Sequence, residues 1–221
     1  MSYARSSQVA SYTALKSNPK GGLFRGNASL GRTTSDNIEL GGALSMNAWK
    51  FQGALFWRKD DNLVDWTFSN AVPAARSANA VDIATSGVEL SATRSWKNVD
   101  LVLGYTGLVK NEDYGSTKID ASFYALNYPK QRLTAALVAK LGGGVELRLD
   151  NEARQQTANI LRKGQGNEYF ISSIGIAWQP TFSPGLIVSG QVDNVWNSDF
   201  QEVPAVPASP RQASVAIAYT W

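Results

Sequence analysis

Apolar and polar residues alternate along most of this chain, and no other feature of the sequence restricts the fold as strongly. In one segment Val145, Leu147 and Leu149 are separated by Glu146 and Arg148. Successive side chains of a β-strand point to opposite faces, whereas a helix would mix the two sets of residues. No segment shows the period of an amphipathic helix, so the pattern predicts an all-β protein.

The alternating segments predict about ten strands, and most of them are long. Several span 10–12 residues, whereas strands of soluble sheets typically have about 5–6. A tilted strand of about 9–11 residues is long enough to cross a bilayer. The expected strands are Ser2–Tyr12, Ser35–Met46, Trp49–Lys59, Ile83–Trp96, Val99–Lys110, Gln131–Lys140, Val145–Gln156, Tyr169–Gln179, Leu186–Asn194 and Gln212–Trp221.

The connections between these strands are short and long in turn. The short ones are Asn47–Ala48, Lys97–Asn98, Gly142–Gly144 and Gln179–Gly185. The long ones, rich in Gly, Asn, Asp, Ser and Pro, are Lys16–Thr34, Asp60–Asp82, Asn111–Lys130, Thr157–Glu168 and Val195–Arg211. This division is typical of outer-membrane β-barrels and not of soluble sandwiches. We therefore expect a portion of an antiparallel up-and-down transmembrane β-barrel, with short periplasmic turns and long extracellular loops.

The aromatic residues follow the same division. Beside the short turns or at the chain end lie Trp49, Trp96, Trp178 and Trp221, and near the long loops lie Trp57, Tyr105 and Phe170. Aromatic belts at the two membrane interfaces give this distribution. In the alternative, a soluble secreted β protein that binds carbohydrate, the same side chains pack in a core. Strand length and loop sorting favour the barrel.

The composition excludes several classes of function. The chain has no His and no Cys, so it has no Ser-His-Asp or Cys-His triad, no zinc finger and no haem held by those residues. Its net charge of +3 is too small to indicate nucleic acid as a partner. We expect a protein that is not an enzyme, with no catalytic residues, no metal site and no cofactor.

One predicted strand carries a strongly charged face. Its charged residues Glu146, Arg148, Asp150, Glu152 and Arg154 occupy every second position. A Lys or Arg on the lipid face costs about 2–4 kcal/mol at the bilayer midplane. We therefore expect these five side chains to face the lumen, where they either line a transport path or pair across strands and with a plug.

Aromatic and basic residues in or beside the long loops are the candidate ligand contacts. They are led by Trp66, Arg76, Tyr114 and Tyr124. Such side chains grip a planar or anionic metal chelate by stacking and by charge, although packing among the loops would use them equally well.

The same loops hold a cluster of carboxylates. Asp60, Asp61 and Asp65 lie close together with Asn62. The cluster lacks the spacing, the glycine and the terminal glutamate of an EF-hand loop. We expect it to lie in a solvated loop and not to form a calcium site.

Two segments resemble TonB-dependent outer-membrane receptors. In the last strand pair of these receptors an Asn-(Leu/Val)-aromatic step precedes an acidic and aromatic loop, prolines, an arginine and the final strand. The matching positions here are Asn194, Val195, Trp196, Asp199, Phe200, Pro204, Pro207, Arg211 and Trp221. The segment Tyr12–Arg32 resembles the Gly-Asn-Pro-x-Leu loop of the cobalamin- and siderophore-type members, with Ala28 where proline is usual.

The resemblance implies a barrel around an N-terminal plug that imports a scarce nutrient, such as cobalamin or a ferric siderophore, across the bacterial outer membrane. It implies the plug domain, the TonB complex, a small-molecule metal chelate, outer-membrane lipid and the barrel assembly machinery as partners. Tyr219 and Trp221, in a terminal aromatic strand, resemble the signal that this machinery recognises.

The length adds an expectation about domain organisation. At about 22 residues per strand, a 22-stranded transporter barrel takes roughly 490 residues before any plug, whereas this chain has 221. We expect residues 1–221 to form the C-terminal part of a receptor barrel, without the plug and the first half of the barrel. Two unpaired edges would follow, so a smaller closed barrel or a curved open sheet is expected. The alternative is an independent ten-stranded outer-membrane barrel that acts as an adhesin or a small pore.

Overall fold

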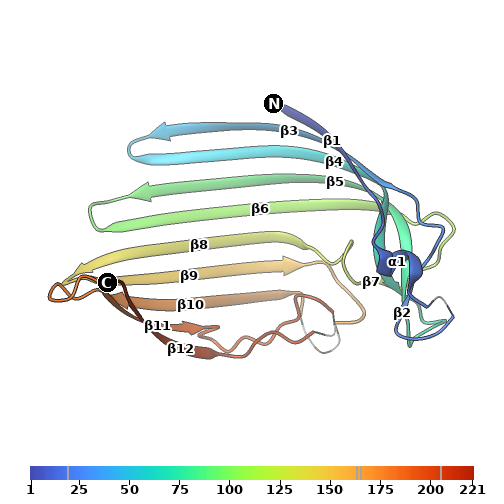
Figure 1. Cartoon of the computed structure of the whole chain (residues 1–221). Coiled ribbons are helices and arrows are strands. Elements are labelled where there is room, and N and C mark those ends of the chain that lie inside the picture. Colours follow the sequence, from blue (N-terminus) through green and yellow to red (C-terminus); the bar gives the residue numbers. More distant parts are fainter. Residues whose placement is uncertain (19, 163, 165, 205) are drawn as a thin grey trace.

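A computed structural model describes residues 1–18, 20–162, 164, 166–204 and 206–221. Pro19 and Ala205, which belong to the two segments with family resemblance, lie outside the described residues. Within the described part, ten strands follow one another in chain order across one antiparallel sheet (Figure 1). These strands are β1 (Ser2–Gln8), β3 (Thr33–Met46), β4 (Trp49–Phe68), β5 (Arg76–Ser95), β6 (Val99–Asp113), β8 (Pro129–Gly142), β9 (Val145–Gln156), β10 (Glu168–Trp178), β11 (Leu186–Asp193) and β12 (Gln212–Tyr219).

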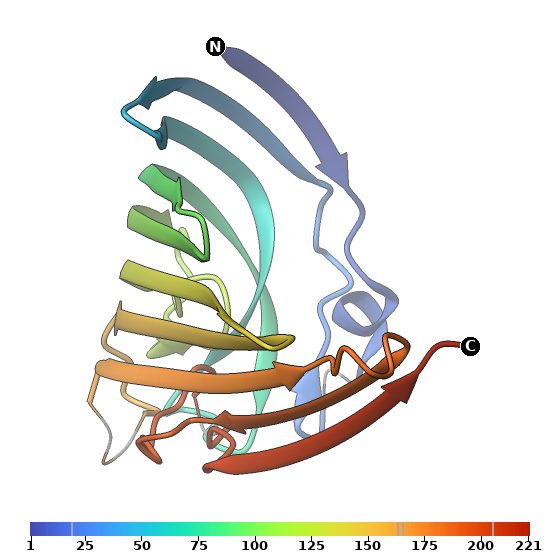
Figure 2. The same ribbon diagram turned by 90° about the vertical axis from the view of Figure 1, so that its left-hand side faces the viewer.

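The sheet is curved and open. Its strands bend around one side like part of a cylinder wall, with β1 and β12 at the two edges (Figure 2). Each of these edge strands pairs with one neighbour among the described residues. Of the two forms expected for the chain, the structure therefore has the curved open sheet.

Most strand boundaries agree with the sequence pattern, and β9 has the predicted bounds. The first strand differs, because β1 ends at Gln8 and not at Tyr12. Tyr12–Lys16 instead forms α1, a short helix that the alternation pattern did not predict, and the Ser11 side chain caps its start by accepting a hydrogen bond from the Ala14 amide. Among the described residues, no helix has the length and apolar character to cross a membrane.

The segment Asp60–Asp82, expected as a long loop, is mostly strand. β4 and β5 are each 20 residues long, so only residues 69–75 connect them. Asn62 has a φ of 55°, and the register shifts between Asp60 and Leu63. A bulge of this kind moves the following residues to the opposite face. The broken alternation hid the continuing strand from the sequence pattern.

Loops cover these extended strands at the extracellular end. The two-residue strands β2 (Phe24–Arg25) and β7 (Ala121–Ser122) pair with β5 and β4 respectively. Beneath them lies a small apolar core of Val81, Ile83 and Ala125, against which Leu63, Tyr114 and Leu126 pack. The apolar core of the described chain thus lies where the loops pack on the extended parts of β4 and β5.

The curved wall has two faces of opposite character. On one face, large apolar side chains such as Leu44, Leu55 and Ile176 are exposed. The other face is the concave one and carries polar residues such as Gln52 and Thr106. A wall with an apolar face toward lipid and a polar face toward a lumen has this division.

Candidate functional site

A row of side chains crosses the concave face toward its extracellular end. The register pairs Glu89 with Thr106, Thr106 with Arg132, Arg132 with Arg154, and Arg154 with Tyr169. Directly opposed residues of an antiparallel pair project to the same side of the sheet. The row therefore runs from β5 to β10 along one face and gathers two arginines near its end.

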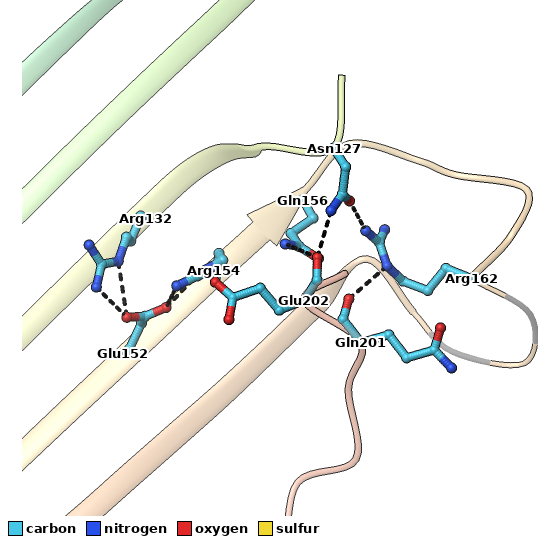
Figure 3. A network of polar contacts seen from close by, with 8 residues as sticks. All are labelled: Asn127, Arg132, Glu152, Arg154, Gln156, Arg162, Gln201 and Glu202. Atoms are coloured by element: carbon cyan, nitrogen blue, oxygen red, sulfur yellow. Dashed lines mark hydrogen bonds and ion pairs between the residues drawn. The ribbon is translucent and has the colours of Figure 1, made fainter. Parts of the chain in front are cut away.

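Glu152 lies between these two arginines. Its carboxylate is 2.6 Å from Nη2 of Arg132 and 2.5 Å from Nη2 of Arg154. Both arginines also donate to it through Nε (Figure 3). Charge-assisted bonds of this kind are short and directional, so the carboxylate holds both guanidinium groups in fixed orientations.

The connection between β11 and β12 folds onto this part of the concave face. Phe200 stacks on Tyr169 with ring centroids 4.2 Å apart. The Glu202 carboxylate lies 2.5 Å from Nη1 of Arg154 (Figure 3). Together with Arg132, these side chains line a cavity of about 410 Å³. The Tyr169 hydroxyl oxygen is buried and has no hydrogen-bond partner among the described residues.

Arg162 also holds the β11–β12 connection in place. Its side chain donates to the backbone oxygen of Gln201 and to the side-chain oxygen of Asn127 (Figure 3). It also donates to the backbone oxygen of Thr157 and to the side-chain oxygen of Asn167, and the four distances are 2.5–3.0 Å. The residue is 5% exposed, and burial lowers the pKa of its guanidinium. Four oxygen acceptors from three separate segments of the chain replace its hydration shell and explain why a buried arginine is tolerated there.

The five residues predicted to face the lumen share one face of β9. The register opposes Glu146 to Lys140, Arg148 to Val138 and Asp150 to Ala136. Arg148 and Asp150 form an ion pair of 2.6 Å. The structure thus brings Glu152 and Arg154 into the network around the cavity, which Asp150 also lines, and leaves Glu146 and Arg148 nearer the periplasmic turn.

The four predicted ligand contacts lie in different surroundings. Trp66 packs edge-on against Phe24, and the Arg76 guanidinium lies 4.1 Å from the centroid of the Phe123 ring. Tyr124 is 51% exposed. Trp66 and Arg76 both contact Phe24, so they help to pack loops on the extended strands.

Tyr114 donates a hydrogen bond of 2.7 Å to the Asp65 carboxylate, which also accepts one from the Ala125 amide. Burial and the Asp65 charge raise the pKa of the Tyr114 phenol. Asp65 is completely buried and Asp60 is 4% exposed. The expected solvated loop is therefore wrong for these two carboxylates, because the bulged strand places both against neighbouring segments. The described residues contain no group of acidic side chains that would hold a metal ion.

The C-terminal aromatic residues lie at an edge of the sheet. Tyr219 ends β12 and is 58% exposed, and Trp221 is fully exposed. Their expected role in assembly needs this exposure, since another protein has to contact them.

Sequence reasoning missed Arg162 and Glu202 as site residues. The contacts of Arg162 with Asn127 and Gln201, and of Glu202 with Arg154, join residues 35–48 positions apart in the chain, and no periodic pattern connects such positions. The aromatic and acidic character of the 195–211 connection was the available signal, because Phe200 and Glu202 are the residues that reach the cavity.

These features define a class of protein. Long antiparallel strands, one lipid-compatible face, one polar concave face and loops gathered at one end form the wall of a transmembrane β-barrel.

Comparison with known proteins gives the family. Residues 1–195 match the family described as TonB dependent receptor-like, beta-barrel. The chain therefore belongs to the TonB-dependent receptor β-barrel family, and it is a protein of the bacterial outer membrane. No curated protein matches the sequence.

Solved structures share the fold. The FrpB iron transporter from Neisseria meningitidis (F3-3 variant) superimposes with a TM-score of 0.69 at 21% identity, over 98% of this chain and 36% of that one. The copper transporter OprC superimposes with a TM-score of 0.74 at 14% identity, over 99% of this chain and 36% of that one. The siderophore receptor PirA from Pseudomonas aeruginosa superimposes with a TM-score of 0.65 at 18% identity, over 98% of this chain and 35% of that one. The chain thus spans about a third of the length of these proteins.

Proposed function

We propose that this chain forms part of the barrel wall of an outer-membrane receptor that imports a scarce metal chelate. The similar structures include iron, siderophore and copper transporters by their descriptions. A ferric siderophore is the substrate that we favour, with cobalamin as a second member of the same class. Transport is energised through TonB, which acts on a plug domain held inside the complete barrel.

The cavity on the concave face carries this proposal, with Arg132 and Arg154 lying among the carboxylates of Asp150, Glu152 and Glu202 in its lining. Arg132 and Arg154 are oriented by Glu152, Phe200 supplies a stacking ring, and the buried hydroxyl of Tyr169 is unpartnered. Metal chelates that carry carboxylate or phenolate oxygens present the charges and planes that these groups bind. The function needs no bond chemistry in the wall, and none of these residues is placed as a nucleophile.

We also propose that the chain supplies the C-terminal portion of the barrel. The open edges at β1 and β12 would each pair with a strand from the rest of the receptor, since an unpaired edge in lipid leaves backbone groups without partners. The chain's match to about a third of the length of similar structures is consistent with such a portion.

Uptake by whole cells tests the function. Cells that express the receptor containing this chain, and cells that lack it, are given radiolabelled ferric siderophores of the catecholate, hydroxamate and carboxylate classes, labelled cobalamin and copper. We expect uptake of one of these probes only in the expressing cells, and loss of this uptake when TonB is deleted. Arg154→Gln should reduce the uptake, while the amount of receptor in the outer membrane remains unchanged.

Two outcomes would contradict the proposal. Equal uptake in cells with and without the receptor would remove the transport role. Uptake that continues without TonB would instead indicate a passive pore, which is the second candidate, since a small barrel needs no energy coupling.

A further inference from the structure

The lipid-facing side of the wall contains a groove that crosses β3 to β8. Its floor is formed where Gly42 and Gly53 lie opposite each other, and a Cβ added at Gly42 would meet no atom within 4 Å. Apolar side chains form its sides, among them Leu44, Phe51, Leu90, Leu103, Tyr105 and Leu133. The groove has a volume of about 620 Å³, which is large enough to hold part of an apolar chain.

Arg94 lies on the same face, at the periplasmic end of the groove. The register opposes it to Trp49 on one side and to Leu101 on the other, so it projects toward lipid. Its guanidinium lies 5.4 Å from the Trp49 ring centroid and 4.6 Å from that of Trp96. Among the described residues it has no ion pair or hydrogen bond, and its Nε is buried without a partner.

A charged side chain in this position needs a counter-charge. An arginine facing lipid is tolerated near the membrane interface, where its head reaches the polar headgroups. Trp49 and Trp96 belong to the aromatic belt at the level of these headgroups. The anion available at that level is a phospholipid phosphate, and the guanidinium fork matches phosphate oxygens.

We propose that this surface is a binding site for a phospholipid of the periplasmic leaflet. The phosphate lies on Arg94 between the two tryptophan rings, and one acyl chain follows the groove toward Gly42. This site is separate from the concave cavity and does not depend on which nutrient the receptor carries.

The spacing along β5 agrees with one lipid that occupies both parts. From Arg94 the next lipid-facing positions are Ala92 and Leu90. Each step of two residues is about 6.7 Å, so Leu90 lies about 13 Å from Arg94 along the strand. Ala92 lies opposite Phe51 and Leu103, and its small side chain leaves a continuous path between their larger ones.

Native mass spectrometry of the protein purified from outer membranes in mild detergent tests the site. The protein is titrated with dioleoyl phosphatidylglycerol, and we expect one retained lipid per chain. Arg94→Gln removes the phosphate contact, and Gly42→Leu fills the groove from a position where a Cβ meets no atom within 4 Å. Each is expected to weaken lipid binding about fivefold or more. Arg94→Lys, which keeps the charge, should weaken binding less than Arg94→Gln.

Matched controls lie on the same face. Gly190→Leu fills a lipid-facing position between β10 and β12, where a Cβ meets ordinary contacts. Arg5→Gln removes an arginine near the other end of the wall, where it is paired with Asp36. Both should bind the lipid like the unchanged protein, and heat-dependent mobility on gels shows which variants are folded. Arg94→Met replaces Arg94→Gln if the latter does not fold.

Two results would overturn the proposal. The first is unchanged lipid retention in folded Arg94→Gln and Gly42→Leu proteins. The second is displacement of the lipid by millimolar inorganic phosphate together with unchanged binding in Gly42→Leu, because this pattern would make free phosphate the ligand.

Discussion

Arg154 of β9 and Glu202 of the β11–β12 connection form an ion pair of 2.5 Å across 48 positions of the sequence. The Arg154 side chain is 11% exposed, whereas that of Glu202 is 62% exposed. The arginine is therefore part of the wall, and the glutamate belongs to the more exposed connection that lies on it. This pair, the Phe200–Tyr169 stack and the Arg162 contacts together hold the connection on the concave face.

Removing the charge of Glu202 should loosen this connection without unfolding the wall. Glu202→Gln is expected to cost about 0.5–1 kcal/mol, the range for a pair with one exposed partner. Trypsin cleavage after Arg211 should become a few-fold faster, because the connection leaves the concave face more often. Asp199→Asn is the matched control, since it removes one charge from the same connection at an exposed position. Equal cleavage rates in the two variants would contradict this role of the pair.

Arg162 should be the more important attachment. Arg162→Gln removes a guanidinium that reaches four oxygen atoms, and the loss is expected to cost about 2–3 kcal/mol, because buried acceptors are left without donors. Hydrogen exchange should become faster at the Gln156 amide, which donates to Asn167 beside this site. The amides of the central strands β5 and β6 should keep their exchange rates. Uniform acceleration across the sheet would indicate global destabilisation instead.

Tyr114 should stay protonated at pH values where ordinary tyrosines ionise. Its pKa is raised above 10.0 by burial and by the Asp65 carboxylate. A raised folded-state pKa contributes stability that is complete below pH 10 and is lost as the pH rises above it, since the unfolded chain binds fewer protons there. Tyr114→Phe should therefore reduce stability at pH 8 by about 1–2 kcal/mol and flatten the loss of stability above pH 10. Chemical unfolding between pH 8 and 11 measures both, and an unchanged pH profile would refute the assignment.

Gly87 should accept no side chain while Phe56 is present. An added Cβ there would overlap the Phe56 ring and the Leu108 side chain, whereas one at Gly42 meets nothing. Gly87→Ala is expected to destabilise the wall by about 1–3 kcal/mol, the usual cost of overpacking. Combining it with Phe56→Ala should recover part of this loss, because the second change removes the overlapping ring. Gly42→Ala is the control, and unfolding in denaturant is the measurement.

The matched motif around Asn194 has a physical explanation in the structure. Asn194 has a φ of 49°, its side-chain amide donates to the Ser198 and Ser209 oxygens, and its side-chain oxygen accepts from the Ser198 amide. An asparagine tolerates this backbone conformation better than most residues and bonds locally. Trp196 then donates to the Ser172 hydroxyl on the lipid-facing side. The motif therefore forms the start of the β11–β12 connection, and Asn194 also holds the end of this connection by its hydrogen bond to Ser209.

The sequence by itself determined the strands, their two faces and the family. All three depend on the two-residue alternation, which is a local pattern. Every strand shows it, because each strand has lipid on one side and a polar interior on the other. For the same reason it predicted which face of β9 carries Glu152 and Arg154. It also indicated that the connections alternate between short turns and long loops, because loop composition is local too.

Only the tertiary structure decided what the extracellular segments do. The bulge at Asn62 extended β4 beyond the predicted end, and the loops packed on it buried Asp65. The contacts of Arg162 and Glu202 join residues that are distant in the chain. Such contacts depend on how loops pack against a curved wall, and a pattern of neighbouring residues contains no information about that packing.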